Sequence, residues 1–166
     1  MTNLKIKIYN LTLNLSTMKK IELFLSVLAV VFIVMKILVL PWSGVLLALT
    51  LLTLSFFYYF LSFALFNKIS LKGIFNKSSY ENLSTFKIFF TIGIGWTFSI
   101  TIVGALFKLE LLPYANFILL IGIIAIGIIS FVSLIFKYQT NSDFYKQILL
   151  RNLIIGGTGI FLILTN

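Results

Sequence analysis

MKILVLPWSG, residues 35–44, is followed 72 residues later by FKLELLPYAN, residues 107–116. In both stretches a lysine, a Leu-Pro pair and an aromatic residue occupy the same register. Each stretch also lies between two long apolar runs. We therefore expect two related membrane hairpins, one turning at Pro41 and Trp42 and the other at Pro113 and Tyr114.

The composition indicates an integral membrane protein. Apolar residues make up 60% of the chain and the mean hydropathy is +1.12. Only 13 basic and 4 acidic residues are present, which is too few to cover the surface of a soluble domain. The net charge of +9 does not indicate a nucleic-acid partner, because the basic residues are spaced between apolar runs instead of clustering with aromatic residues.

The chain contains neither cysteine nor histidine. This removes thiol nucleophiles, imidazole bases and the commonest ligands of zinc, copper and haem. The four carboxylates are also far apart in the sequence. We therefore expect no catalytic residue, no cofactor and no metal site, and we expect that the protein is not an enzyme.

The apolar runs predict an all-α membrane protein with five transmembrane helices. Each run approaches the ~20 residues that cross a hydrocarbon layer of ~30 Å. Two tandem, parallel helical-hairpin repeats are followed by one further helix. We divide the chain into an N-terminal extension, hairpin repeat 1, a basic cytoplasmic loop, hairpin repeat 2, and a cytoplasmic segment with the C-terminal helix: residues 1–17, 18–66, 67–87, 88–136 and 137–166.

The N-terminal extension has a different pattern. Apolar and polar residues alternate through residues 4–15, which predicts two short strands around Asn10. The alternative is that translation begins at Met18, because Met18-Lys19-Lys20 before an apolar run is typical of the start of a membrane protein.

The first predicted span, residues 21–40, ends before Pro41, and Pro41 is well suited to open the second helix. That second helix ends in the aromatic residues Phe56, Phe57, Tyr58, Tyr59, Phe60, Phe63 and Phe66. An interfacial belt is the favoured interpretation, and an aromatic binding wall is the alternative.

Small residues mark the third and fourth spans as packing helices. Gly95 and Ser99 form a small-xxx-small pair, which lets another helix approach closely. We expect helix packing at Gly93, Gly95, Ser99, Gly104, Gly122 and Gly127.

The last span, residues 148–164, is short, so we expect Arg151 to extend back to the interface. If the N-terminus is cytoplasmic, 11 of the 13 basic residues lie on that side and only Lys36 and Lys108 lie on the other. This asymmetry predicts a cytoplasmic (inner) membrane protein with its N-terminus inside and its C-terminus outside.

The hairpin pattern resembles a known family. Residues 103–109, VGALFKL, followed by Pro113 and an apolar helix, are similar to the transmembrane hairpin of the L subunit of the Bacteroidota gliding-motility and type IX secretion motor. The resemblance implies a shared hairpin fold, present here twice. It also implies a membrane-embedded glutamate in the second helix of the hairpin, but Leu54 and Ile126 stand at those positions, so motor activity does not carry over.

Three charged residues near the turns are the candidate functional groups. Lys36 and Lys108 are either snorkelling anchors or functional cations. Glu110 is the only acid on the predicted outer side. It is two residues from Lys108, a spacing that does not bring side chains together on a helix, so we expect it to pair with Lys36 across the repeats.

These observations favour a non-catalytic scaffold or accessory subunit of a membrane complex. The expected partners are the lipid bilayer and either another membrane protein or further copies of the chain. The alternative is a small transporter or channel with its pathway at the repeat interface, where hydroxyl residues such as Thr50, Thr97 and Thr101 could line a path.

Overall fold

The computed structural model of the protein describes residues 2–81, 83–140 and 143–165, and in it the side chains of residues 2–17, 72, 138–140 and 143 are left undescribed. The described chain is helical and contains no strand. Five α-helices and two short 3-10 helices follow one another: α1 (Thr2–Ile37), α2 (Ser43–Phe66), η1 (Leu71–Gly73), η2 (Lys77–Ser79), α3 (Thr85–Leu109), α4 (Ala115–Thr140) and α5 (Asp143–Leu164).

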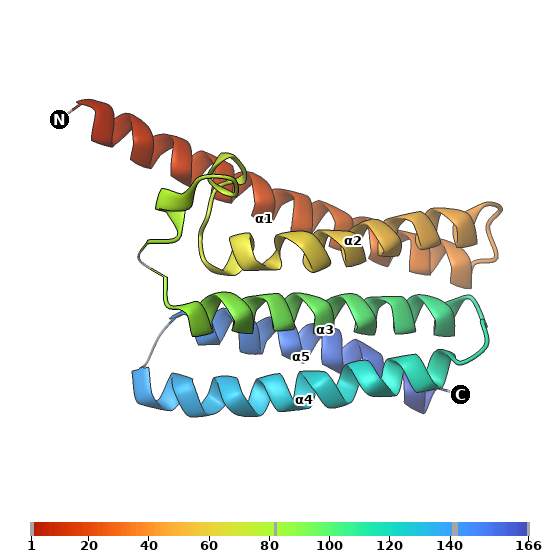
Figure 1. Ribbon diagram of the computed structural model, residues 1–166. Coiled ribbons are helices and arrows are strands. Elements are labelled where there is room, and N and C mark those ends of the chain that lie inside the picture. Colours follow the sequence, from red (N-terminus) through yellow and green to blue (C-terminus); the bar gives the residue numbers. More distant parts are fainter. Residues whose placement is uncertain (1, 82, 141–142, 166) are drawn as a thin grey trace.

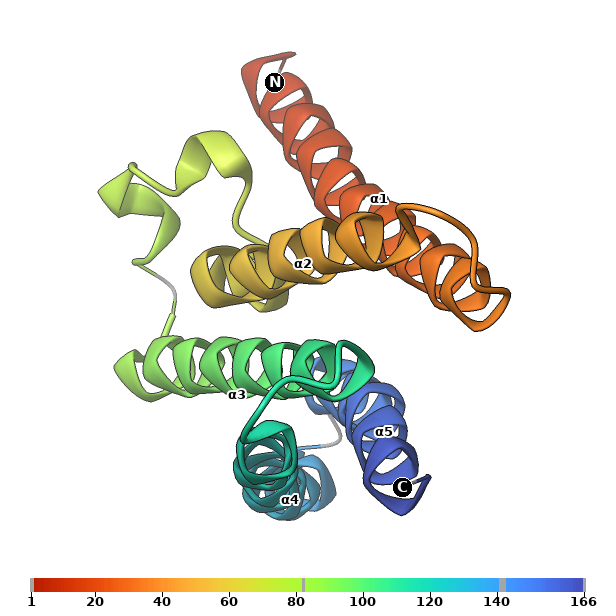
Figure 2. The same ribbon diagram turned by 90° about the vertical axis from the view of Figure 1, so that its right-hand side faces the viewer.

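The helices form an up-and-down bundle. Both hairpin turns and the C-terminal end of α5 lie at one end of the bundle, and the segment between α2 and α3 lies at the other (Figure 1). Seen end-on, α1 and α2 form one pair, and α3 packs between α2 and α4 (Figure 2). Helix α5 contacts α3 and α4. The predicted all-α architecture is therefore confirmed.

The two hairpin turns have the same backbone geometry in the same register. At the end of α1, the Leu40 N–H donates to the Met35 carbonyl (3.0 Å) and the Val39 N–H donates to the Lys36 carbonyl (3.0 Å). This pair of bonds is a Schellman motif, which satisfies carbonyl groups at a helix end. The same motif ends α3, where Leu112 donates to Phe107 (2.8 Å) and Leu111 donates to Lys108 (3.2 Å).

The backbone conformation of the turn residues explains why the chain reverses at each turn. Val39 and Leu111 adopt the left-handed conformation, with φ of 56° and 55°. Trp42 and Tyr114 adopt it too, with φ of 64° and 60°. Each proline stands between two left-handed residues, one position after the Schellman motif. The expectation that Pro41 opens the next helix is wrong, because α2 begins two residues later, at Ser43.

Small residues bring α2 and α3 together, as predicted. A Cβ atom on Gly95 would lie 2.5 Å from the Tyr58 carbonyl oxygen of α2 and would also overlap Ser62 Oγ. One turn further, the Ser99 and Ser55 hydroxyl groups are 2.7 Å apart. The two backbones can approach this closely because neither Gly95 nor Ser99 carries a bulky side chain.

The contact between α3 and α4 also depends on glycine. A Cβ on Gly104 would lie 2.7 Å from Leu119 Cα, and one on Gly122 would lie 2.8 Å from Thr101 Cα. Gly93 and Gly127 are different, because no described atom outside their own neighbourhood lies within 4 Å of such a Cβ. Within the described chain both glycines therefore face open space and pack against no other helix, so packing there against another subunit stays a prediction.

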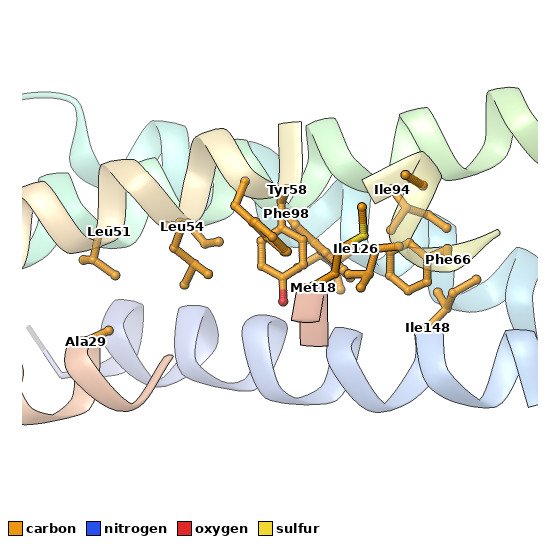
Figure 3. Close-up of a cluster of buried hydrophobic side chains, with 14 of the residues drawn as sticks. Met18, Ala29, Leu51, Leu54, Tyr58, Phe66, Ile94, Phe98, Ile126 and Ile148 are labelled. Carbon is orange, nitrogen blue, oxygen red and sulfur yellow. The ribbon is translucent and has the colours of Figure 1, made fainter. Parts of the chain in front are cut away.

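The aromatic residues of α2 do not form a single belt. Phe57, Tyr58 and Phe66 are buried, whereas Phe56 and Phe60 are exposed. Tyr58 packs edge-on against Phe98 of α3, with ring centroids 5.1 Å apart (Figure 3). The belt interpretation fails for the buried residues, because a helix turns by about 100° per residue and a run of adjacent aromatics covers both its inner and outer faces.

The N-terminal residues are helical and not strand-like. Residues 2–17 continue α1, which is 36 residues long and extends past the rest of the bundle (Figure 1). An isolated two-stranded hairpin is marginally stable, whereas a helix satisfies its backbone hydrogen bonds within itself. This explains why the helical continuation prevails over the alternating pattern.

Within the described residues, four helices are long and apolar enough to cross a membrane, and these are α2, α3, α4 to Lys137, and α5 from Phe144. Helix α1 is long enough, but its apolar part follows Lys19 and Lys20 directly and also contains Glu22 and Lys36. Whether α1 can lie in a membrane therefore depends on how these charged groups are paired.

Candidate functional site

An ion pair between the first and last helices is the most strongly bonded polar group in the described chain. Arg151 of α5 donates from Nε to Glu22 Oε1 (2.6 Å) and from Nη2 to Glu22 Oε2 (2.7 Å). The Tyr58 hydroxyl of α2 donates to the same Glu22 Oε1 (2.6 Å). Three helices that are distant in sequence therefore meet at one carboxylate.

This cluster lies inside the bundle, away from the nearest ends of α2 and α5. Tyr58 is eight residues before the end of α2 and Arg151 is eight residues after the start of α5, or about 12 Å at ~1.5 Å per residue. The side chains of Arg151 and Glu22 are only 16% and 12% exposed. A charge at such a depth is tolerated when its partner supplies full hydrogen bonding, which the bidentate geometry does.

The sequence analysis did not find this cluster. It expected Arg151 to extend back to the interface, and that expectation is wrong, because the guanidinium points inward to Glu22 and packs 5.2 Å from the Phe66 ring centroid. A signal was present, since Glu22 is the only acid and Arg151 the only arginine of the predicted spans. Such charges in a membrane usually pair with one another.

A groove runs from this ion pair between α1 and α5. Its volume is about 660 Å³, and α2 and α3 supply its floor through residues such as Leu54, Tyr58 and Ile102. The remaining lining is largely apolar, with Val30 and Ile33 on α1 and Ile154 and Leu162 on α5 among the residues that face it. Glu22, Arg151, Lys19 and Gln147 give one end of the groove a polar character.

A second ion pair joins the two hairpins near their turns. Lys36 Nζ lies 2.6 Å from Glu110 Oε2, and the two side chains are 29% and 23% exposed. The predicted pairing across the repeats is therefore confirmed. Lys36 is in the last turn of α1, and Glu110 is the C-cap residue that directly follows α3.

Gly44 makes room for this carboxylate at the start of α2. A Cβ on Gly44 would lie 3.1 Å from Glu110 Oε2. Because the N-terminus of a helix carries a partial positive charge, this position also favours the anion. The other carboxylate oxygen, Oε1, is buried and has no hydrogen-bond partner among the described residues.

The remaining predicted residues at the turns do not join this pair. Lys108 Nζ instead donates to Asn116 Oδ1 (2.9 Å), across the second turn. Pro41, Trp42, Pro113 and Tyr114 are all exposed, and Trp42 and Tyr114 are 78% and 79% accessible. Their exposure is consistent with the predicted position of both turns at a membrane surface.

Most of the intramembrane hydroxyl groups are used by their own helices. Thr50, Thr97 and Thr101 donate to the carbonyl groups four residues earlier, at 2.8, 2.9 and 2.8 Å. Ser62 donates to the Thr91 carbonyl of α3 (3.0 Å). These side chains therefore serve helix geometry and helix packing, and they do not form a continuous polar path.

One segment of the chain matches a known protein family. Residues 93–148 match the family model of the GldL N-terminal domain. The predicted resemblance to this gliding-motility subunit is thus confirmed. Neither curated proteins nor solved structures gave a match to the chain.

The GldL match covers the second hairpin and leaves out most of the ion-pair residues. It begins at Gly93 in α3, includes the turn and α4, and ends at Ile148 near the start of α5. Of the charged groups described above, Lys108 and Glu110 lie inside it. Glu22 and Lys36 belong to the first hairpin, and Arg151 follows the matched segment.

The Lys36–Glu110 bond therefore ties the GldL-like hairpin to the first hairpin, and its strength can be measured. Exposed ion pairs contribute ~0–1 kcal/mol and breaking buried ones costs ~3–5 kcal/mol, so for this partly buried pair we expect a coupling of about 1 kcal/mol or more. A double-mutant cycle with Glu110→Gln and Lys36→Met, read by thermal unfolding in detergent, tests this.

The matched control is Lys20→Met, an exposed lysine near the middle of α1 and 16 residues before Lys36. Its effect and that of Glu110→Gln should be additive. Additivity between Glu110→Gln and Lys36→Met would instead show that this bond contributes nothing to stability.

Proposed function

We propose that the protein is a non-catalytic scaffold or accessory subunit of a membrane complex and that its second hairpin is the part that contacts other subunits. The observation that carries the proposal is the GldL match over residues 93–148. It falls on a helical hairpin of the kind found in a membrane motor subunit, although neither Leu54 nor Ile126 could carry a proton.

Two features support a role in assembly. The outer face of α4 is apolar and includes Gly127, where a side chain would meet open space. A neighbouring helix could approach closely there. In addition, Glu22, Arg151 and the partly buried Lys36 each pair with an opposite charge within the chain. Such fixed pairing suits a structural role.

Purification from the native membrane with a mild detergent tests this proposal. We expect a membrane protein to copurify in a fixed ratio. Gly127→Leu should reduce its recovery severalfold, because the new side chain would block close approach to α4. Gly157→Leu is the matched control, since Gly157 is also open but lies on α5, outside the matched segment. Equal recovery with both variants would contradict docking at the second hairpin.

We also propose that all five helices cross the cytoplasmic membrane, with the N-terminus inside. Helix α1 carries more charged residues than the other helices, but its Glu22 and Lys36 are each paired. Pairing lowers the cost of holding these charges in the membrane. The 11 to 2 distribution of basic residues supports the orientation.

Reporter fusions test this topology. A reporter that is active only outside the cytoplasm should be active after Asn166 and inactive at Ser79. An inactive reporter after Asn166 together with an active one at Ser79 would reverse the orientation. Activity at both sites would mean that one or all of the three helices between them, α3, α4 and α5, do not cross the membrane.

A transporter is the second candidate, and the groove with its charged end is the observation that favours it. Its weakness is that the hydroxyl groups form no continuous path. If the protein is a scaffold, reconstituted vesicles should discharge a pH gradient no faster than empty vesicles. A saturable flux that Glu22→Gln abolishes would favour the transporter.

A further inference from the structure

The groove between α1 and α5 has the size of a small-molecule site. Its volume of about 660 Å³ lies within the ~300–1,000 Å³ that is usual for such sites. It is apolar along most of its length and polar at one end.

The length of the groove matches one leaflet of a bilayer. Its lining extends on α1 from Lys19 to Ile33, about 21 Å, and on α5 from Gln147 to Leu162, about 22 Å, at ~1.5 Å per residue. Half of a bilayer that is ~40–45 Å thick with its headgroup regions is ~20–22 Å. One phospholipid of a single leaflet, with its headgroup, would therefore lie along the groove from end to end.

The polar end has the charge that a phosphate group requires. Lys19 and Arg151 carry two positive charges against the single carboxylate of Glu22. Arg151 spends one Nε and one Nη2 hydrogen on Glu22, and its Nη1 lies 3.5 Å from the Gln147 carbonyl, so it retains donor capacity beyond its bidentate bond. Basic pockets between transmembrane helices are known to recognise anionic headgroups.

We propose that this groove is a binding site for one anionic phospholipid of the surrounding bilayer. One acyl chain lies between α1 and α5, over Leu54 and Ile102, and the phosphate group lies at Lys19 and Arg151. The lipid completes the packing between α1 and α5, which otherwise meet at the Glu22–Arg151 pair.

Native mass spectrometry of the full-length protein in a mild detergent tests the proposal, with phosphatidylglycerol and phosphatidylcholine added at equal concentration. We expect one tightly retained phospholipid per chain and at least a fivefold preference for phosphatidylglycerol. Val30→Trp should reduce retention tenfold or more, because Val30 lines the groove but is itself 61% exposed, so the larger side chain blocks the groove without entering the core.

Matched controls separate this site from general lipid contact. Val31→Trp places the same residue one position away, outside the groove, and should retain lipid as the unmodified protein does. Lys19→Gln should abolish the headgroup preference, whereas Lys20→Gln should preserve it. Equal retention by Val30→Trp and Val31→Trp, retention of free fatty acid only, or no preference between the two headgroups would each overturn the proposal.

Discussion

Replacing Arg151 with methionine is expected to lower the free energy of unfolding by about 3–5 kcal/mol, the largest effect of any single change at the described charged groups. The reason is that Glu22, whose side chain is 12% exposed, would remain as a buried carboxylate without its bidentate partner. Thermal unfolding in detergent and the amount of folded protein recovered from membranes both measure this loss.

The double variant Arg151→Met/Glu22→Gln makes the prediction specific. It should recover most of the lost stability, since a buried ion pair is often no more stable than a neutral pair of similar volume. The amide oxygen of the new glutamine can still accept from the Tyr58 hydroxyl, which bonds Glu22 at 2.6 Å. Lys146→Met, at an exposed lysine of the same helix, is the control. If the single and double variants were equally unstable, loss of packing by Arg151 and not an unpaired charge would be the cause.

Gly95→Leu is expected to have the second largest effect. The new side chain would start 2.5 Å from the Tyr58 carbonyl oxygen and overlap Ser62, and neither α2 nor α3 can move without losing the Ser55–Ser99 contact of 2.7 Å. Overpacking of a core costs about 1–3 kcal/mol and occasionally more. The same detergent unfolding assay applies.

Gly93→Leu is the matched control, because it is two residues away on the same helix and faces open space. It should leave stability unchanged or raise it by up to about 1 kcal/mol, since glycine is a poor helix former. Equal destabilisation at both positions would mean that the close approach of α3 to α2 is not the cause of the loss.

The fold could be predicted to a large extent from the sequence, because each helix had its own local signal. Long apolar runs predicted helices α2 to α5, and the paired Leu-Pro-aromatic segments predicted the two turns. Gly95 and Ser99 also predicted the correct close contact. The strand prediction for the N-terminal residues was wrong. It rested on local alternation alone, whereas these residues form one continuous helix with the residues that follow them.

Of the two ion pairs, only one could be predicted from the sequence. The Lys36–Glu110 pair could be inferred because the repeat fixes the relative depth of its two residues. Glu22 and Arg151 are 129 residues apart and Arg151 lies outside both repeats, so their meeting depends on how α5 returns to α1. The groove depends on the same arrangement, since its walls come from the first and last helices.

The separation of Glu22 and Arg151 has a consequence for biogenesis. If α1 crosses the membrane as proposed, its carboxylate enters the bilayer before the guanidinium of α5 has been synthesised. Until then Glu22 has no bidentate partner and would have to stay near the headgroup region or in contact with the insertion machinery. A nascent chain that stops before α5 would therefore keep an unpaired carboxylate in its first membrane segment.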